Sequence, residues 1–438
     1  MSKSGELDQE ERKSVGDCKS SVYELAMAAR KAADQMGATP DYVRNGALAH
    51  MANSLRANIS KVLEANERDM KQASAQGMAE GLLDRLMLDT TRIDAMAASL
   101  EDLIALADPL GKVQQHRKLL NGLDLKRVSV ALGVVAMVYE ARPNVTADAA
   151  GICIKTGNAV ILRGGSAAKH SNAVIADVLH MAAHEAGMPL NCVSLIRDTD
   201  RRSTDELMSL HGIVDVLIPR GGAGLIRHCV EFSKVPVIET GTGNCHVYVH
   251  EQANLDMAFS IAINSKCRRI GVCNAAETLL VDKAIAQNFL PDILPALSKA
   301  GVLIHADETS YAIAQSLHIE EVVAANEHDW ETEYLAAEIA IKCVTGLEEA
   351  IEHINFYGTK HSEAIVTEDE RAADRFCAAV DAAAVYVNAA TSFTDGAEFG
   401  MGAEIGISTQ KLHARGPFSL EALTSYKYIL HGNGQVRS

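Results

Sequence analysis

The stretch that decides the fold is GVVAMVYEARPNVTADAAGICIKTGNAVILRG, residues 133–164. It opens with a short apolar run, continues with a segment of helical spacing, and closes with a second apolar run. The same alternation continues through residue 240. Such a pattern is typical of βαβ units, in which helices cover both faces of a parallel sheet. The sequence therefore predicts an α/β fold, with strands expected at 133–140, 158–164, 192–197, 214–222 and 235–240.

The pattern changes on both sides of this region. Residues 20–120 repeat apolar residues at three- and four-residue spacing, which predicts a helical layer. After residue 254 a second series of helical and apolar segments predicts a further α/β domain. The expected division of the chain is 1–122 for the helical layer and the first part of the nucleotide-binding domain, 123–133 for an arm, 134–246 for the rest of that domain, 247–417 for a second α/β domain, and 418–438 for a C-terminal strand.

Composition excludes several classes of protein. The 438 residues carry a formal net charge of −16, whereas affinity for nucleic acids comes from clustered Lys and Arg. The nine cysteines include no C-x-x-C pair, which disfavours a disulfide framework and a zinc site. Residues 1–20 are polar and lack the apolar part of a secretory signal. We therefore expect a cytoplasmic protein without a metal.

Two glycine-rich turns follow predicted strands. Arg-Gly-Gly-Ser at 163–166 and Arg-Gly-Gly at 220–222 each lie between a strand and a helix. Helix N-termini favour anions, and ligands of open α/β sheets bind beyond the carboxyl ends of the strands. Either turn alone is compatible with an ordinary tight turn, but the two together indicate a nucleotide site, although no G-x-G-x-x-G fingerprint is present. The candidate residues are Arg163, Gly164, Gly165, Ser166, Arg220, Gly221 and Gly222.

Cys273 lies in KCRRIGVCNAAE, residues 266–277. Buried free cysteines mostly act as small hydrophobic residues, but a thiolate favoured by positive charge or by a helix N-terminus is a nucleophile. Glu239, at the end of a predicted strand, is in the same way either a solvated rim residue or a functional one. The residues alone leave open a nucleotide-linked α/β enzyme with a nucleophilic cysteine, and a Cys–His hydrolase with His361 or His413 as the base.

Longer motifs resemble the aldehyde dehydrogenase superfamily. They cover the chain in order from about residue 20, and Cys273 follows Glu239 by 34 residues, the separation that the superfamily shows. The resemblance implies a variant Rossmann cofactor domain, an α/β catalytic domain that carries the nucleophilic cysteine, and a bridging oligomerisation arm made from 123–133 and 418–438. The motifs are VYEARPNVTADAAGICIKTGNAVILRGGSAA (138–168), VIETGTGNCHVYV (237–249), GVCNAAETLLV (271–281), YGTKHSEAIVTED (357–369) and TDGAEFGMGAEIGISTQKLHARGP (394–417).

More narrowly, the motifs resemble the acyl-phosphate-reducing members of that superfamily, which implies the reduction of L-glutamyl 5-phosphate by NADPH to L-glutamate 5-semialdehyde, the second step of proline biosynthesis from glutamate. The Cys273 thiolate would displace phosphate and form a thioester. Asn144 and the Cys273 N–H would donate to the developing oxyanion. Arg163 stands where many relatives have the lysine of a Lys-Pro-Ser turn, and a guanidinium there suits a ribose 2′-phosphate, which favours NADPH over NADH.

The chain also departs from relatives that oxidise aldehydes to free acids. It has Glu-Thr-Gly-Thr-Gly at 239–243 in place of Glu-Leu-Gly-Gly-Lys, so we expect Glu239 to position the thiol or exchange a proton with it rather than to activate a hydrolytic water. The remaining contacts implied by the resemblance are Thr240, Gly241 and Glu333 with the cofactor, and Arg142, Ser392 and Asp395 with the substrate.

The resemblance further implies a dimer or larger homo-oligomer. Because an acyl phosphate is labile and favours transfer at close range, transient contact with glutamate 5-kinase is a hypothesis. Three alternatives remain: the same fold acting on another acyl donor such as a CoA thioester or oxidising an aldehyde, a catalytically silent scaffold of this fold, and the Cys–His hydrolase.

Overall fold

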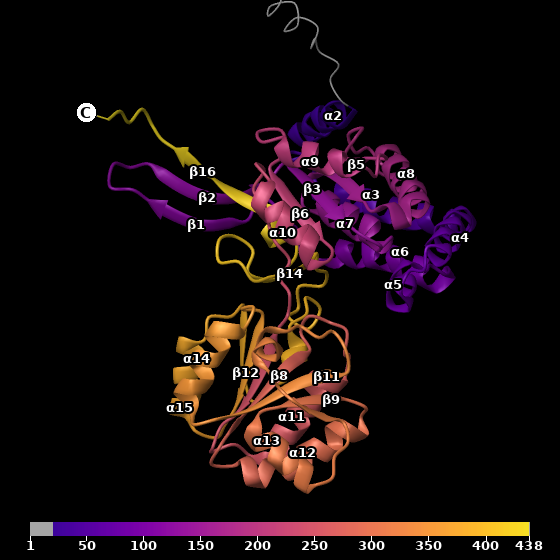
Figure 1. The fold of residues 1–438 in the computed structure, drawn as a ribbon. Helices are drawn as coiled ribbons and strands as arrows, with labels where there is room; N and C mark the ends of the chain where they lie inside the picture. The colour runs from indigo at the N-terminus through magenta and orange to yellow at the C-terminus, as the bar shows by residue number, and fades with distance from the viewer. Residues whose placement is uncertain (1–20, 438) are drawn as a thin grey trace, which may run out of the picture. The chain divides into compact units, whose positions relative to one another are not determined.

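The computed structural model describes residues 21–437, which form two compact units (Figure 1). The first unit comprises the chain up to Val237 together with the segment from Leu423 onward, and the second unit is Ile238–Ala422. The polar segment 1–20, from which we inferred the lack of a secretory signal, lies outside the described residues.

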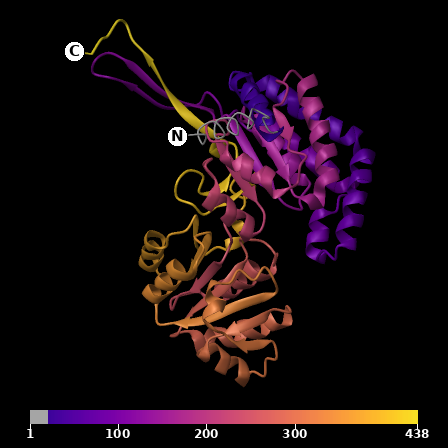
Figure 2. The same cartoon turned by 45° about the horizontal axis from the view of Figure 1, so that its top comes forward.

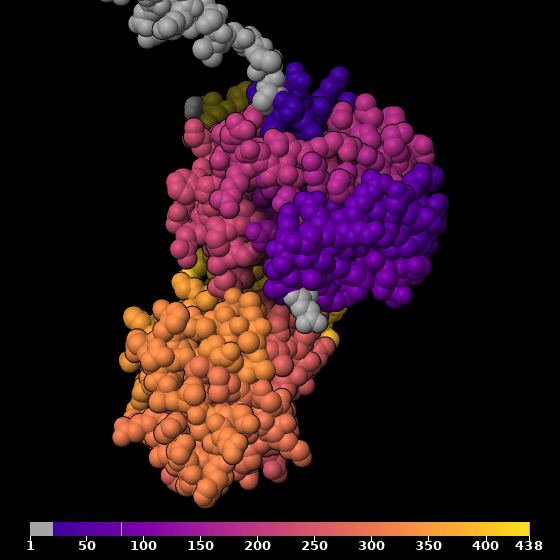
Figure 3. Space-filling model, turned by 45° about the vertical axis from the view of Figure 1, so that its right-hand side comes forward, coloured from indigo at the N-terminus to yellow at the C-terminus, as the bar shows by residue number. Residues whose placement is uncertain are grey.

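Helices begin the first unit, as the spacing of apolar residues predicts. The buried side chains of α3 follow that spacing, and α3 packs against the later helices α7 and α8 as well as against α6. The Asp89 carboxylate caps α6 by accepting a hydrogen bond from the Arg92 amide. In Figure 3 these indigo helices form one continuous surface with the magenta segments of the following βα units. The helices are α2 (Ser21–Met36), α3 (Asp41–Ala57), α4 (Ile59–Ala75), α5 (Glu80–Leu86) and α6 (Thr90–Ala105).

A four-stranded parallel sheet forms the centre of the first unit. Its strand order is β5-β4-β3-β6, so the chain reverses direction across the sheet at β3. In open α/β sheets such a reversal marks the crevice where ligands bind. The strands are β3 (Val134–Tyr139), β4 (Ala159–Gly164), β5 (Val193–Leu195) and β6 (Val216–Arg220), and the helices are α7 (Asn144–Lys155), α8 (Lys169–Glu185) with the short η1 (Ser166–Ala168) before it, α9 (Arg201–Ser209) and α10 (Ala223–Phe232).

The strand expected at 235–240 is absent from the structure. Only Val237 forms a bridge, with Leu217, and residues 238–244 are not part of a strand. Pro236 has no N–H to give to a ladder, which explains why the apolar run does not extend the sheet. The apolar run instead ends the first unit.

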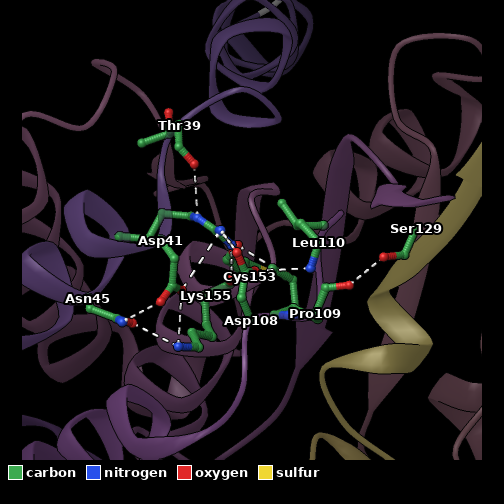
Figure 4. Close-up of polar contacts among 11 residues, drawn as sticks. Thr39, Asp41, Asn45, Asp108, Pro109, Leu110, Ser129, Cys153 and Lys155 are labelled. Carbon is green, nitrogen blue, oxygen red and sulfur yellow. Dashed lines mark hydrogen bonds and ion pairs between the residues drawn. The ribbon is translucent and has the colours of Figure 1, made fainter. Parts of the chain in front are cut away.

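Two buried cations fasten helix α3 to helix α7 (Figure 4). The Lys155 Nζ lies 2.8 Å from the Asn45 Oδ1 and 3.2 Å from the Asp41 Oδ1. The Arg44 guanidinium donates to the Lys155 carbonyl and to the Asp108 carboxylate, the latter at 2.7 Å. Since an unpaired buried cation is strongly destabilising, these contacts satisfy both charges where the two helices meet.

An antiparallel three-stranded sheet stands out from the helical body of the first unit (Figure 2). It consists of β1 (Val113–Lys118), β2 (Asp124–Ala131) and β16 (Thr424–His431), in the order β1-β2-β16. The Ser129 hydroxyl donates to the Pro109 carbonyl at 2.7 Å and so ties β2 to the end of the helical layer. The expected arm at 123–133 contains β2, but β1 was wrongly placed in the helical layer, because its exposed sequence VQQHRK has no apolar alternation. We refer to these three strands as the arm.

The second unit contains a seven-stranded parallel sheet of order β10-β9-β11-β8-β7-β12-β13. Neighbouring residues of one strand face opposite cores: Val247 packs in the cluster beneath α11–α13, and Tyr248 in the cluster beneath α14 and α15 (Figure 1). A sheet buried on both faces is what near-continuous apolar runs predict. The strands are β7 (Cys245–Val249), β8 (Ala276–Asp282), β9 (Leu303–Ala306), β10 (Val322–Ala324), β11 (Glu338–Val344), β12 (Ser362–Val366) and β13 (Ala384–Val387).

The helices of the second unit are α11 (Leu255–Cys267), α12 (Ala286–Lys299), α13 (Glu308–Ser316), α14 (Leu347–Tyr357) and α15 (Glu370–Ala379). Short elements complete it: β14 (Gly406–Ser408) pairs with β15 (Gly416–Phe418), and η2 (Glu327–Glu331), η3 (Thr391–Phe393) and η4 (Glu421–Leu423) are single turns. The boundary expected between residues 246 and 247 falls inside β7, whereas the two units divide at Val237 and Ile238. Similarly, the return to the first unit comes at Leu423 rather than at residue 418.

Candidate active site

The two glycine-rich turns of the first unit meet at Glu140, directly after the central strand β3. The Gly222 amide donates to the Glu140 Oε2 at 2.9 Å, and a Cβ on Gly221 would lie 2.6 Å from the same oxygen. A Cβ on Gly165 would lie 3.3 Å from the Glu140 Cα. The structure therefore brings both predicted turns together at the point where the strand order reverses. Glu140 was not predicted, because a single acidic residue after a strand carries no signal of its own.

The side chain of Arg163 is buried and contacts the backbone of the loop before α9. Its guanidinium Nη2 donates to the carbonyl oxygens of Thr199 (2.8 Å) and Asp200 (3.0 Å), and the residue is only 8% exposed. Burial lowers the pKa of Arg163, against the opposing effect of nearby aspartates. These contacts connect the end of β4 to the loop before α9, and the role of Arg163 toward a 2′-phosphate stays a prediction.

Asn144 is exposed as the first residue of α7, and its amide is held from within the helix. The Asn144 Nδ2 donates to the Asp148 Oδ2 at 3.0 Å, one helical turn later. Burial raises the pKa of Asp148 to about 6, and the Asn144 hydrogen bond and the charge of Arg220 oppose that rise. Asn144 thus carries an oriented amide at the carboxyl end of the sheet, where Arg142 also lies in the connection from β3 to α7.

Cys273 is partly exposed in the loop between α11 and β8. Contacts with η3 secure the next residue: the Asn274 Nδ2 donates to the Thr394 carbonyl at 3.0 Å, and the Thr391 hydroxyl donates to the Asn274 carbonyl at 2.7 Å. Ser392, a predicted substrate contact, accepts a further hydrogen bond at its carbonyl from the same Asn274 amide, at 3.3 Å. The fold therefore brings Ser392 to the loop that carries Cys273, residues 268–275, which we call the nucleophile loop. Asp395 follows Ser392 by three residues.

The carbonyl of Cys273 packs against Gly243. A Cβ on Gly243 would lie 2.7 Å from the Cys273 Cα and would overlap the Cys273 carbonyl oxygen. The same oxygen accepts a hydrogen bond from the Cys245 thiol at 3.2 Å. The Gly243 amide donates to the Glu333 Oε1 at 2.6 Å, and burial raises the pKa of Glu333. Gly243 and Cys245 were not predicted as site residues, and only the glycine-rich run 239–243 hinted at close packing.

Glu239 lies four residues before Gly243 and is partly exposed. Its backbone amide donates to the Gln410 Oε1 at 3.1 Å, and the Gly241 amide donates to the Ile407 carbonyl at 3.0 Å. Thr240 between them is buried. The run that begins at Glu239 is thus held by residues 407–410 at one end and reaches the Cys273 loop at the other.

The two histidines considered as hydrolase bases have other contacts. The His361 Nδ1 lies 2.8 Å from the Ser362 hydroxyl and 3.6 Å from the Cys245 sulfur. Burial lowers the pKa of His361 to about 4, which leaves it a weak base. The His413 Nε2 lies 2.7 Å from the Ala422 carbonyl oxygen. This geometry disfavours the Cys–His hydrolase.

Within residues 21–437, the His, Cys, Asp and Glu side chains form no cluster of three or more that suits a metal ion. No helix in that range has the length and the apolar character needed to cross a bilayer.

A protein-family model, known protein sequences and solved structures all match this chain. The aldehyde dehydrogenase family model matches residues 7–332. Gamma-glutamyl phosphate reductase of Moorella thermoacetica is 54% identical over 416 residues, which cover 95% of this chain and 98% of the relative. The protein of that name from Thermoanaerobacter pseudethanolicus is 50% identical over 412 residues, which cover 94% and 98%. The crystal structure of gamma-glutamyl phosphate reductase from Thermotoga maritima superimposes with a TM-score of 0.93 at 44% identity and covers 96% of this chain and all of that one. The chain therefore belongs to the aldehyde dehydrogenase family, a family of nicotinamide-dependent enzymes, and within it to the gamma-glutamyl phosphate reductases.

Proposed function

We propose that this protein reduces L-glutamyl 5-phosphate to L-glutamate 5-semialdehyde and phosphate, with NADPH as reductant and Cys273 as nucleophile. This is the second step of proline biosynthesis from glutamate, and we place it in the cytoplasm. The observation that carries the proposal is the fixed peptide of Cys273, packed on Gly243 and hydrogen-bonded by Cys245, in a chain half identical to relatives named for this reaction.

The proposed reaction begins with attack of the Cys273 thiolate on the acyl carbon of the substrate. Phosphate leaves with the bonding electron pair, and a thioester to Cys273 remains. The Asn144 amide and the Cys273 N–H donate to the oxygen that becomes negative in this step. The bound NADPH supplies the hydride that reduces the thioester. The resulting thiohemiacetal expels the Cys273 thiolate and releases the semialdehyde.

The two glycine-rich turns fit a nicotinamide dinucleotide. They stand at the carboxyl ends of β4 and β6, on either side of the strand where the order reverses, and each precedes a helical turn whose amides favour phosphate. We assign cofactor contacts to Arg163–Ser166 and Arg220–Gly222, and further contacts in the second unit to Thr240, Gly241 and Glu333. The preference for NADPH rests on the arginine at position 163.

The substrate contacts are proposed at Arg142, Ser392 and Asp395. A guanidinium suits a carboxylate or a phosphate, and a hydroxyl and a carboxylate suit the ammonium end of a glutamyl group. Glu239 is proposed to position the Cys273 thiol or to exchange a proton with it, because the hydrolysis of a thioester would waste the substrate.

The reaction run backwards tests the proposal. Pyrroline-5-carboxylate, which is in equilibrium with the semialdehyde, is supplied with NADP⁺ or NAD⁺ in the presence and absence of phosphate. We expect formation of the reduced cofactor to require phosphate and to be faster with NADP⁺, and it is followed by its absorbance. Turnover without phosphate would mean a hydrolytic aldehyde dehydrogenase. A parallel assay replaces phosphate with coenzyme A. Turnover only with coenzyme A would mean a thioester-forming enzyme. Inactivity with phosphate, with coenzyme A and with neither would favour the scaffold alternative.

We propose in addition that the arm joins two or more copies of the chain. Among residues 21–437, β16 pairs only with β2, so in that part of the chain one of its edges has no partner strand, and Tyr428 and Leu430 on it are exposed. We expect sedimentation at micromolar concentration to show at least a dimer that Tyr428→Glu weakens. Met181→Glu, an equally exposed position on α8, is the control and should leave the dimer unchanged. A wild-type monomer across the dilution series would refute this role of the arm.

Transient contact with glutamate 5-kinase stays a hypothesis, motivated by the lability of the acyl phosphate.

A further inference from the structure

A buried ion pair brackets the nucleophile loop. The Lys266 Nζ lies 2.5 Å from the Glu277 Oε2, and both side chains are fully buried. Lys266 is in the last turn of α11 and Glu277 is the second residue of β8, so the loop that carries Cys273 runs from one partner to the other. Because burying two charges is costly, a buried pair is weak evidence for stability, and a role in specifying one geometry is a hypothesis to test.

Glu277 also holds a strained turn. Its second oxygen, Oε1, accepts a hydrogen bond from the Leu335 amide at 3.2 Å. Leu335 has a φ of 51°, in the left-handed region that a branched residue rarely adopts, and it is 44% exposed. Its side chain gains little from burial there, and the hydrogen bond to Glu277 stabilises this backbone conformation.

The strained turn places Glu333, two residues before Leu335. The Glu333 Oε1 accepts from the Gly243 amide at 2.6 Å, and Gly243 packs directly on the Cys273 carbonyl. One line of contacts therefore runs from Lys266 through Glu277, the Leu335 turn, Glu333 and Gly243 back to Cys273. It starts in the helical turn that leads into the Cys273 loop and ends within that loop.

We propose that Glu333, supported by the Lys266–Glu277 pair, is, beside its proposed cofactor contact, a positioning residue that holds the peptide of Cys273 through Gly243. This inference rests on the proposed role of Cys273 as the nucleophile. A peptide whose carbonyl is fixed has its neighbouring N–H groups fixed as well, and a donor to an oxyanion is effective only when it is aimed in advance. Release of the Gly243 amide from Glu333 should therefore slow the chemical step itself, measured at saturating cofactor.

The test compares Glu333→Ala with Glu333→Gln. Alanine removes the acceptor for the Gly243 amide, whereas glutamine keeps an oxygen in the same place. In the reverse reaction at saturating NADP⁺ we expect Glu333→Ala to lower kcat roughly 10- to 100-fold. The Kd of NADPH, measured by fluorescence titration, reports the proposed cofactor contact of Glu333 separately. Glu333→Gln should restore kcat to within about threefold, since its amide oxygen still accepts a hydrogen bond. Glu331→Ala is the matched control, because that exposed carboxylate contacts His328 instead.

An unchanged kcat in Glu333→Ala at saturating cofactor would limit Glu333 to its proposed cofactor contact and overturn the positioning role. Lys266 and Glu277 are tested together as Lys266→Met with Glu277→Leu, because removal of one partner leaves a buried charge without its counter-ion. This pair of substitutions should lower kcat like Glu333→Ala, and a wild-type kcat in the folded double variant would remove the ion pair from the proposal.

A second measurement separates failure of this inference from failure of the proposed function. The rate of Cys273 alkylation by iodoacetamide is followed by peptide mass spectrometry in protein without cofactor or substrate. We expect Glu333→Ala to change that rate at least about threefold and Glu333→Gln to restore it, because a thiol's reactivity depends on its local surroundings. This holds even if the wild type shows no phosphate-dependent turnover. An alkylation rate unaffected by Glu333→Ala would refute the positioning role.

Discussion

Replacement of Cys273 by serine should lower the phosphate-dependent turnover by about 10⁴-fold or more, the scale of loss seen when a covalent nucleophile is removed from an enzyme. A thiol is partly ionised near neutral pH and is intrinsically nucleophilic, whereas a serine hydroxyl needs an adjacent base. The residue is partly exposed, in contrast to Cys245 and Cys153, whose thiol pKa values are raised by burial. Among these thiols, Cys273 is the one that a substrate can reach.

The measurement is the initial rate of NADP⁺ reduction with pyrroline-5-carboxylate and phosphate. Cys377→Ser, an exposed thiol on α15, serves as the control and should keep the wild-type rate. Fluorescence titration of NADPH verifies that Cys273→Ser still binds cofactor. A variant that keeps more than about a tenth of the turnover would exclude a thioester to Cys273 as an obligatory intermediate.

Gly243→Ala should lower kcat by about 100-fold, because a shift of roughly 1 Å in a reacting group has that effect. The added methyl group cannot be accommodated beside the backbone of Cys273, since backbone atoms have no rotamer through which to move away. Either strand β7 or the nucleophile loop must shift. The loss should appear in kcat at saturating cofactor, because the displaced backbone carries the nucleophile.

Gly46→Ala provides the comparison, because the new methyl group there lies in open space on helix α3. Alanine is favoured over glycine in a helix by up to about 1 kcal/mol, so this control should be as stable as wild type or more so. Rate constants and thermal unfolding midpoints are measured for both variants. Wild-type turnover in Gly243→Ala would show that the packing of Gly243 on Cys273 has no role in catalysis.

The sequence predicted those parts of the fold that follow from local patterns. Short apolar runs between helices are visible in any window of the chain, and the strands β3, β4 and β6 lie where those runs predicted them. The run at 235–240 shows the limit of this approach, because its apolar residues read as a strand while Pro236 and the end of the unit prevent one. Strand β1 was missed for the opposite reason: it is exposed on both sides and owes its structure to pairing with β2.

The candidate site divides in the same way. Cys273, Glu239 and the glycine-rich turns stand in recognisable motifs, so they were named from the sequence. The contacts of Gly243 with Glu333 and of Glu277 with Leu335 join residues 90 and 58 positions apart, and a buried glutamate looks like any other in the sequence. The engagement of Arg163 by the Thr199 and Asp200 carbonyls depends on a loop conformation that no residue pattern specifies.

The last strand of the chain, β16, has a consequence for the order in which the protein is made and folds. It pairs with β2 along eight residues, and the Asn158 amide binds the Leu423 carbonyl at 2.9 Å, so the first unit is closed by residues synthesised after the whole of the second unit. A nascent chain on the ribosome holds β2 with one open edge until residues 424–431 emerge. Open strand edges promote association with other chains. Folding of the second unit, which is continuous in sequence, can run to completion during that wait, and the arm is completed only after it.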